Sequence, residues 1–270
     1  MKRIIDQYLL EWKTDESRKS LLVRGARQIG KTYAIRQLGK TYKNFIEINF
    51  EKRPWLIPIF DHDFVPERII KELSEKLKIT IDTKDTLLFF DEIQNAPKVI
   101  TTLGYFYEEM HDLHVIAAGS RIDCAIKKVG MPVGKIKSCY MYLASFLEFL
   151  WAVGQESLAQ KIMEANADSP LDESMHQQLL KFIDQYIVVG GIPEVIMQWC
   201  ATNNEVQTAR MKKEIINSYT HDFDTSAKEF QIKSINDSIA LAKSLEHLGT
   251  ASIAHKFLSK ELDLKAFILL

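Results

Sequence analysis

The sequence G-A-R-Q-I-G-K-T, residues 25–32, is the feature that most restricts how this chain can fold. It fits the pattern G-x-x-x-x-G-K-[ST] at every fixed position, and that pattern is typical of a loop that wraps around a chain of phosphates. An apolar run at 21–23 precedes the loop, and apolar residues at helical spacing follow it from 32 to 38. Loop N–H groups and a helix N-terminus both attract anions, so this order predicts an α/β domain with a phosphate-binding loop after its first core strand.

Each position of the loop has an expected role. The glycines allow a tight turn of the backbone, Lys31 is expected to reach the β and γ phosphates, and the Thr32 hydroxyl is expected to hold a magnesium ion. A glycine loop with an incidental lysine is the alternative, and the flanking strand and helix disfavour it. The residues expected at the nucleotide are Gly25, Ala26, Arg27, Gln28, Ile29, Gly30, Lys31, Thr32 and Tyr33.

Two carboxylates follow a run of four apolar residues at 87–90. The run predicts a buried parallel strand, and such strands deliver polar residues to the sheet edge where ligands bind. We expect Asp91, on a strand neighbouring the phosphate-loop strand, to hold the magnesium ion, and Glu92 to orient or deprotonate the attacking water. Taken alone, an Asp-Glu pair at this place could equally cap the next helix.

Ser120 completes the catalytic set with Lys31 and Glu92. It ends another apolar segment, 113–120, and is expected beside the γ phosphate or the water as a sensor of hydrolysis. His111 and His114 lie three residues apart without a third ligand nearby, so no metal site is predicted there.

The remaining periodicity outlines the other elements. It predicts helices over 3–17, 66–78 and 95–110, strands over 45–50 and 138–143, and an irregular segment over 51–66. The second half is mainly helical, over 156–166, 172–187, 204–220 and 232–248, with Gly190, Gly191 and Pro193 breaking the pattern.

Several motifs together resemble the archaeal-type ATPases of the AAA+ superfamily, which usually carry a further C-terminal domain. The loop is similar to the family's G-x-R-Q-x-G-K-T, and D-E-I-Q-N-A-P at 91–97 is similar to its D-E-I-Q-x-x-P. Ala118-Gly119-Ser120 stands where the family has T-G-S. Further likenesses are P-V-G-K at 132–135 to P-x-G-R, L-A-S-F-L-E-F-L at 143–150 to P-L-S-F-x-E-F-L, and G-G-I-P-E at 190–194 to G-G-x-P-E.

The resemblance implies a P-loop NTPase fold: a three-layer α/β core with a parallel sheet and a C-terminal helical lid. It places the core with its N-terminal helix at 1–154, the lid at 155–250 and the truncated start of a C-terminal domain at 251–270. It further implies ATP and Mg²⁺ as cofactors, assembly with copies of itself or an unknown protein partner, and, by analogy alone, contact with nucleic acid. Simple helical packing without nucleotide contact is the alternative for the lid.

The chain also departs from the family. Lys135 stands where the family has arginine, and the two are not equivalent for gripping a phosphate. Arg121 stands where a second small residue is common. Neither is assigned as an arginine finger, so two functions stay open: Mg²⁺-dependent ATP hydrolysis that moves the lid, and an ATP-binding switch with little or no turnover.

Charge and cysteine content favour a cytoplasmic protein without membrane contact. A net charge of -1 provides no general attraction to nucleic acid or to an anionic membrane. The three cysteines are far apart and indicate reduced thiols, and the N-terminus lacks the apolar core of a signal peptide.

Overall fold

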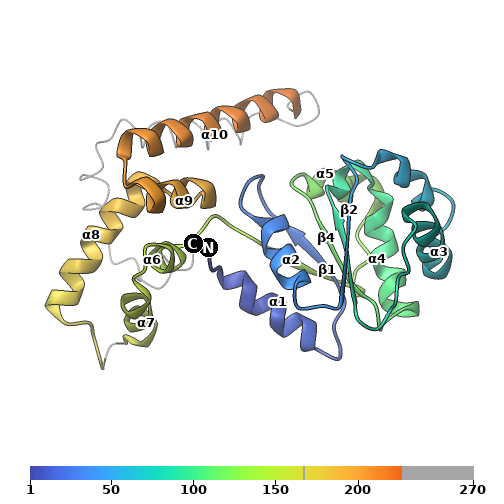
Figure 1. The fold of residues 1–270 in the computed structure, drawn as a ribbon, viewed down its shortest axis with the longest axis horizontal. Coiled ribbons are helices and arrows are strands. Elements are labelled where there is room, and N and C mark those ends of the chain that lie inside the picture. Colours follow the sequence, from blue (N-terminus) through green and yellow to red (C-terminus); the bar gives the residue numbers. More distant parts are fainter. Residues whose placement is uncertain (167, 227–270) are drawn as a thin grey trace. The chain divides into compact units, whose positions relative to one another are not determined.

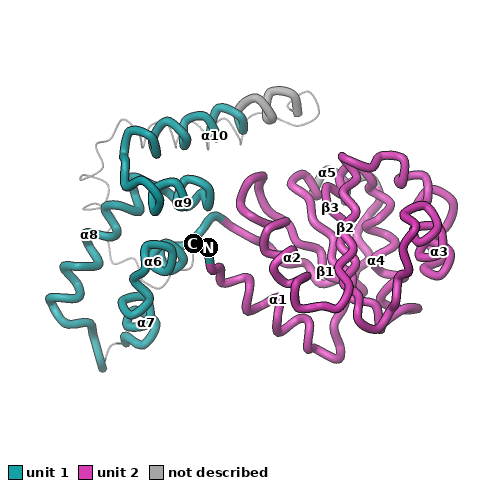
Figure 2. Tube along the Cα trace, in the orientation of Figure 1, with its two compact units in different colours: residues 1, 143–270 teal, residues 2–142 magenta. Residues whose placement is uncertain are grey.

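The computed structural model describes residues 1–166 and 168–226. The chain divides into two compact units, shown in magenta and teal in Figure 2. We call residues 2–142 the N-terminal unit and the described residues from 143 onward the C-terminal unit. The division falls ahead of the boundary expected after residue 154, because helix α6 (Phe146–Ala152) buries its apolar side chains in the core of the C-terminal unit.

The N-terminal unit is built on a five-stranded parallel sheet in the order β2-β3-β4-β1-β5 (Figure 1). This confirms the predicted α/β class with a parallel sheet. The strands are β1 (Ser20–Arg24), β2 (Asn44–Asn49), β3 (Thr86–Asp91), β4 (His114–Ala118) and β5 (Ile136–Tyr140).

The fifth strand lies earlier than the predicted 138–143. It pairs with β1 from Ser20↔Ile136 to Arg24↔Tyr140, and β1 has no further residues with which it could continue. Met141 therefore leaves the sheet, although its N–H still donates to the Arg24 carbonyl at 2.8 Å.

The acidic strand β3 is not the neighbour of the phosphate-loop strand β1, and the expectation that it would be was wrong. Strand β4 lies between them, because Ile116 is in register with both Leu21 and Phe89. Parallel strands are joined by crossovers, so their order in the sheet does not follow from their order in the chain. As a result, the residues that follow β4 lie between the loop and the acids.

Helices cover both faces of the sheet and give three layers (Figure 1). Alternate residues of a strand face opposite sides, so Leu21 and Val23 pack with one set of helices and Leu22 with the other. The first set is α1 (Ile4–Thr14) and α2 (Lys31–Gly39). The second is the 3₁₀ helix η1 (Pro54–Phe60) with α3 (Pro66–Leu77), α4 (Lys98–Glu109) and α5 (Ile122–Val129).

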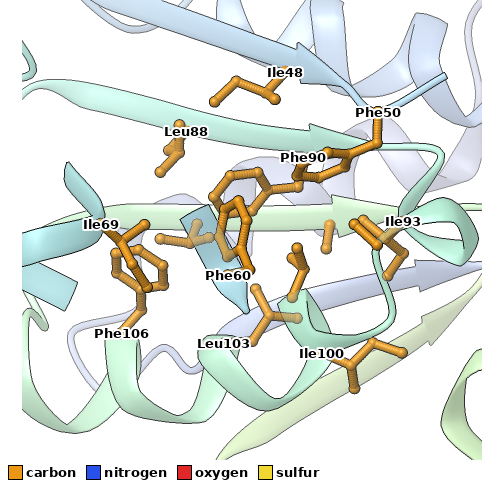
Figure 3. Close-up of a cluster of buried hydrophobic side chains, with 14 of the residues drawn as sticks. Ile48, Phe50, Phe60, Ile69, Leu88, Phe90, Ile93, Ile100, Leu103 and Phe106 are labelled. Atoms are coloured by element: carbon orange, nitrogen blue, oxygen red, sulfur yellow. The ribbon is translucent and has the colours of Figure 1, made fainter. Parts of the chain in front are cut away.

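Strand β3 is buried at all six positions, as its apolar run predicted. In Figure 3, Phe90 on this strand lies beside Phe50 and Phe60, in the larger of the two clusters that pack against the sheet. The Phe60 and Phe90 rings meet edge to face with centroids 5.5 Å apart, a geometry that aromatic pairs prefer. This packing holds the end of β3, where the acids lie, in place.

The C-terminal unit is helical in its described residues. Besides α6 it contains α7 (Glu156–Glu164), α8 (Glu173–Val189), α9 (Pro193–Thr202) and α10 (Glu205–Ser226). Helices α7 and α8 were predicted close to these bounds, and so was the break between α8 and α9. Helix α10 begins where predicted but continues to Ser226, beyond the predicted end at 220. The short helices α5, α6 and α9 were not predicted. The expected helix at 232–248 and the expected domain start at 251–270 lie outside the described residues.

No helix within residues 1–166 and 168–226 combines the length and the apolar character needed to cross a lipid bilayer.

Candidate functional site

The loop after β1 has the backbone that its glycines predicted. Gly25 has φ +141° and Gly30 has φ +94°, in the region that residues with a side chain rarely adopt. Gly30 is the N-cap of α2, so the loop leads directly into the helix N-terminus. A Cβ on Gly25 would lie 2.2 Å from the Met141 carbonyl oxygen, so the loop also packs too closely there for any side chain.

Lys31 is the buried cation of the site, with 8% of its surface exposed. Its Nζ donates to the carbonyl oxygens of Gly25 at 3.0 Å and Ala26 at 2.5 Å. Burial lowers the pKa of Lys31, while the charges of Glu92 and Asp91 act in the opposite direction. An ammonium held mainly by neutral carbonyls is a strong attractor of anions.

Asp91 and Thr32 meet although they lie far apart in the chain. The Thr32 hydroxyl donates to Asp91 Oδ2 at 3.2 Å, and the Glu92 N–H donates to Asp91 Oδ1 at 3.1 Å. Asp91 is only 3% exposed, and its burial, followed by the charge of Glu92, raises its pKa. The structure therefore brings together the two side chains expected to hold the metal.

Asn49, which the sequence reasoning missed, is a third partner of Asp91. It ends β2 in register with Asp91, and its Nδ2 donates to Asp91 Oδ2 at 3.1 Å. A polar residue at the end of a strand beside the acidic strand was a signal that could have identified it.

Glu92 follows β3 with φ +54°, a left-handed backbone that turns the chain sharply at the sheet edge. Its carboxylate accepts a hydrogen bond from Nε2 of Gln94. Gly119 and the half-buried Ser120 come directly after β4, the strand between β1 and β3. Lys31, Glu92 and Ser120 thus all follow strands at the same edge of the sheet.

Arg3 is a second residue that the sequence reasoning missed. Its guanidinium is 5% exposed and donates to the Ile29 carbonyl at 2.8 Å and to the Tyr142 carbonyl at 2.9 Å. It therefore joins the phosphate loop to the segment after β5. An arginine just before the first helix carries no local sign of this contact, because its partners are far along the chain.

The other loop residues differ in exposure. Ala26, Arg27 and Gln28 are exposed, and Tyr33 is 51% exposed. Ile29 is buried in the core cluster with α1 and α2, so only its backbone can face a ligand.

The two basic residues considered near the γ phosphate lie in different surroundings. Lys135 pairs with Glu108 of α4 at 2.8 Å and lies over the Tyr105 ring, while Arg121 is exposed just before α5. Lys135 is therefore held by contacts with residues of α4.

Thr32 and Asp91 suit a magnesium ion. Mg²⁺ is usually held by one or two protein ligands together with phosphates and waters. Within the described part of the chain, no three His, Cys, Asp or Glu side chains form a cluster of the kind that holds a metal by itself. The available donors, a hydroxyl and a buried carboxylate, therefore fit an ion that arrives with a phosphate ligand.

Comparison with known families matches residues 17–150 to a family described as an AAA domain. The matched stretch includes the loop, Asp91, Glu92 and Ser120. Residues 17–150 form an AAA domain. This confirms the resemblance to AAA+ proteins for that stretch, which is a nucleotide-binding domain of the ATPase type.

Over 207 residues, the AAA chain is 28% identical to a protein of Methanocaldococcus jannaschii described as uncharacterized. The match covers 74% of this chain and 40% of the relative, so the chain spans well under half of that protein's length.

Two solved structures are also similar to it. A Walker-type ATPase of Pyrococcus abyssi has a TM-score of 0.48 at 15% identity, covering 84% of this chain and 76% of that one. Drosophila ORC bound to DNA has a TM-score of 0.44 at 14% identity, covering 78% and 66%.

Proposed function

We propose that this AAA chain binds ATP with Mg²⁺ and hydrolyses it to ADP and phosphate. The observation that carries the proposal is the meeting of the Thr32 hydroxyl with Asp91 at 3.2 Å beside the buried Lys31. A buried ammonium and a buried carboxylate on one sheet edge are costly even with the neutral hydrogen-bond partners that they have, and a polyphosphate with its metal would bring an opposite charge to each.

Each residue would have one role. The backbone of residues 25–33 would hold the phosphates, Lys31 would bind the β and γ phosphates, and Thr32 and Asp91 would hold the metal. The bound ion supplies charge neutralisation on the phosphates. Glu92 would accept the proton of the water that attacks the γ phosphorus, and Ser120 would hydrogen-bond beside it.

The larger-scale roles rest on the family resemblance. The C-terminal unit is proposed as the lid that moves with the nucleotide state, within the expected range 155–250. Assembly with copies of the chain, binding of an unknown protein and contact with nucleic acid are proposals of the same kind. Because the chain spans 40% of its relative, the activity of such a longer protein is also a proposal here.

An ATP-binding switch with little or no turnover is the second candidate. One observation favours it: Lys135, which stands where the family has arginine, is paired with Glu108. An arginine finger can raise turnover by about 10³ to 10⁵, and it can come from a neighbouring subunit. In that case the chain would hydrolyse ATP only after a neighbouring subunit had supplied the arginine.

Phosphate release and ATP binding by the purified chain separate the two candidates. We expect Lys31→Ala to bind ATP at least about tenfold more weakly, since it loses a charged contact to phosphate. Glu92→Gln should bind normally and release phosphate about 10²-fold more slowly, the size of a lost general base. Lys98→Ala, which removes an exposed lysine paired with Asp61, serves as the matched control.

The outcomes are distinct. Equal, slow release by the wild type and Glu92→Gln, with ATP bound by both, would favour the switch. No ATP binding by the wild type in excess Mg²⁺ would exclude both candidates. Measuring the size of the protein with and without ATP tests whether turnover depends on assembly.

A further inference from the structure

Gln94 holds the carboxylate of Glu92 from the 3₁₀ turn η2 (Ile93–Asn95). Its Nε2 donates to Glu92 Oε2. The opposite orientation of the amide would place its oxygen against the carboxylate oxygen. The negative charge on Glu92 therefore selects the orientation in which Nε2 faces the carboxylate. Gln94 thus engages one carboxylate oxygen of the residue to which we assign the proton transfer.

The other end of the same amide faces β4. Gln94 Oε1 is buried and has no hydrogen-bond partner within the described residues. A Cβ on Gly119 would lie 2.4 Å from this oxygen, so the oxygen occupies the space that a side chain at position 119 would need. Ser120 is the next residue.

A buried acceptor without a partner is unfavourable, and native structures contain few of them. Here the acceptor lies between the end of β4 and the acid that follows β3. A water molecule brought by the reaction would satisfy it once the side chains around this buried oxygen move apart to admit one.

We propose that Gln94 is a positioning residue for ATP hydrolysis. Its N–H fixes the Glu92 carboxylate, and its Oε1 accepts a hydrogen bond from the attacking water, while Gly119 leaves the room that the amide needs. This role rests on the proposed hydrolysis. In that reaction the water oxygen bonds to the γ phosphorus, the bond to ADP breaks, and the water proton passes to Glu92; Gln94 neither gains nor loses a proton.

Gln94→Met and Gln94→Glu test both ends of the amide. Methionine keeps the length without polar atoms, and glutamate keeps an acceptor but replaces the N–H with an oxygen beside Glu92. We expect kcat for phosphate release to fall about tenfold or more in both, as for a displaced general base. The affinity for ATP with Mg²⁺ and the melting temperature should stay as in the wild type.

The matched control is Gln7→Met. Gln7 Nε2 donates to Glu11 Oε1 at 2.9 Å on the exposed side of α1, so this change removes the same kind of bond away from the site. Its kcat should equal that of the wild type. Equal kcat in Gln94→Met and the wild type, or losses of kcat, ATP affinity and melting temperature together, would overturn the role of Gln94.

Gly119→Ala provides an independent test that leaves Gln94 itself intact. The severe clash is with the end of a flexible side chain, and Ile122 Cγ1 at 3.2 Å need give by only a few tenths of an ångström, so the amide should move aside without unfolding the protein. We expect a fall in kcat similar to that of Gln94→Met and no further fall when Gly119→Ala is added to Gln94→Met. Additive losses would show that position 119 acts through Ser120 and would overturn the link to Gln94.

Failure of this inference and failure of the proposed function look different. If the wild type binds ATP but releases no phosphate, hydrolysis is excluded and the role of Gln94 with it. If the wild type turns over and the Gln94 variants match it, only the role of Gln94 is excluded.

Discussion

At Gly25, backbone conformation and packing demand the same residue. We expect Gly25→Ala to abolish nucleotide binding and to lower the free energy of unfolding by about 1–3 kcal/mol, because φ is +141° and the new Cβ would meet the Met141 carbonyl. Gly134→Ala is the control: its φ is +83° with nothing within 4 Å, so only the smaller backbone effect applies. Urea unfolding and ATP titration of both variants check this. Equal stability losses in the two would contradict the packing argument.

Under the proposed function, Lys31 serves ATP binding at the expense of stability. We expect Lys31→Met to lower ATP affinity at least about tenfold, with the melting temperature of the nucleotide-free chain unchanged or higher. The reason is that burial disfavours the ammonium, as its lowered pKa indicates, and methionine removes that charge without shortening the side chain much. Thermal melts without nucleotide and a binding titration test this. A lower melting temperature would show that the two carbonyl contacts stabilise the fold more than burial costs.

His114 should make stability depend on pH. It lies between the rings of Trp12 and Tyr42, with its Nε2 against the Lys13 carbonyl at 3.2 Å. Burial lowers its pKa to about 4 from 6.5, so below pH 6.5 the unfolded chain takes up a proton that the folded chain refuses. The free energy of unfolding therefore keeps its full value, as far as His114 is concerned, above about pH 6.5, and it decreases as the pH falls toward 4.

We expect a loss on the order of 1–2 kcal/mol across that window, after allowing for solvent screening of a partly exposed ring. Urea midpoints at pH 7 and pH 5 measure it, with His114→Phe as the variant that lacks the titrating group. The same pH dependence in both proteins would assign the effect to other groups.

At the scale of elements, the S-F-L-E segment at residues 145–148 forms the start of helix α6. Ser145 Oγ accepts the Glu148 N–H at 3.3 Å, and Glu148 Oε2 accepts the Ser145 N–H at 2.7 Å. This is a capping box, which satisfies N–H groups at the start of a helix. Both residues are buried, so the segment that resembles a family motif has a structural role at the start of a helix.

Ser145→Ala should therefore lower the free energy of unfolding of the C-terminal unit by about 1 kcal/mol, the usual size of a lost N-cap. Ser157→Ala on the exposed face of α7 is the control and should be neutral, since alanine suits a helix interior. Circular dichroism melts of both variants make the comparison. A neutral Ser145→Ala would mean that water replaces the cap.

Which elements were predictable follows from their patterns. Strand β3 and helix α8 have long, consistent patterns and were predicted close to their bounds. Helix α6 has seven residues and α5 has eight, too few for an apolar period to be distinguished from a buried strand or loop. Strand β5 lies two to three residues earlier than predicted, because its bounds are set by pairing with β1. Such pairing joins distant segments, so the local pattern does not reveal it.

At the scale of the whole molecule, the two units have separate cores. Among the residues that the structure describes, the two clusters on the sheet draw only on residues between 5 and 141, and the third is built on residues 144–215, with Met1 packed against it. We expect residues 1–142 alone to unfold cooperatively and to bind ATP, because their core is complete without the C-terminal unit. Thermal unfolding and ATP titration of this fragment test the expectation. A fragment without a melting transition would show that the sheet needs the rest of the chain.

The sequence by itself determined the phosphate loop, the parallel α/β class, the positions of Asp91, Glu92 and Ser120 at strand ends, and the positions of Lys31 and Thr32 at the start of a helix. These follow from local rules: glycine dihedrals, apolar period and the direction of parallel strands. Only the tertiary structure decided that β4 separates β1 from β3, that Asn49 and Arg3 belong to the site, and that Gln94 contacts Glu92 and Gly119. Those contacts depend on which distant segments pack side by side. That packing is decided by the free energy of the whole fold, so it cannot be inferred from any single stretch of sequence.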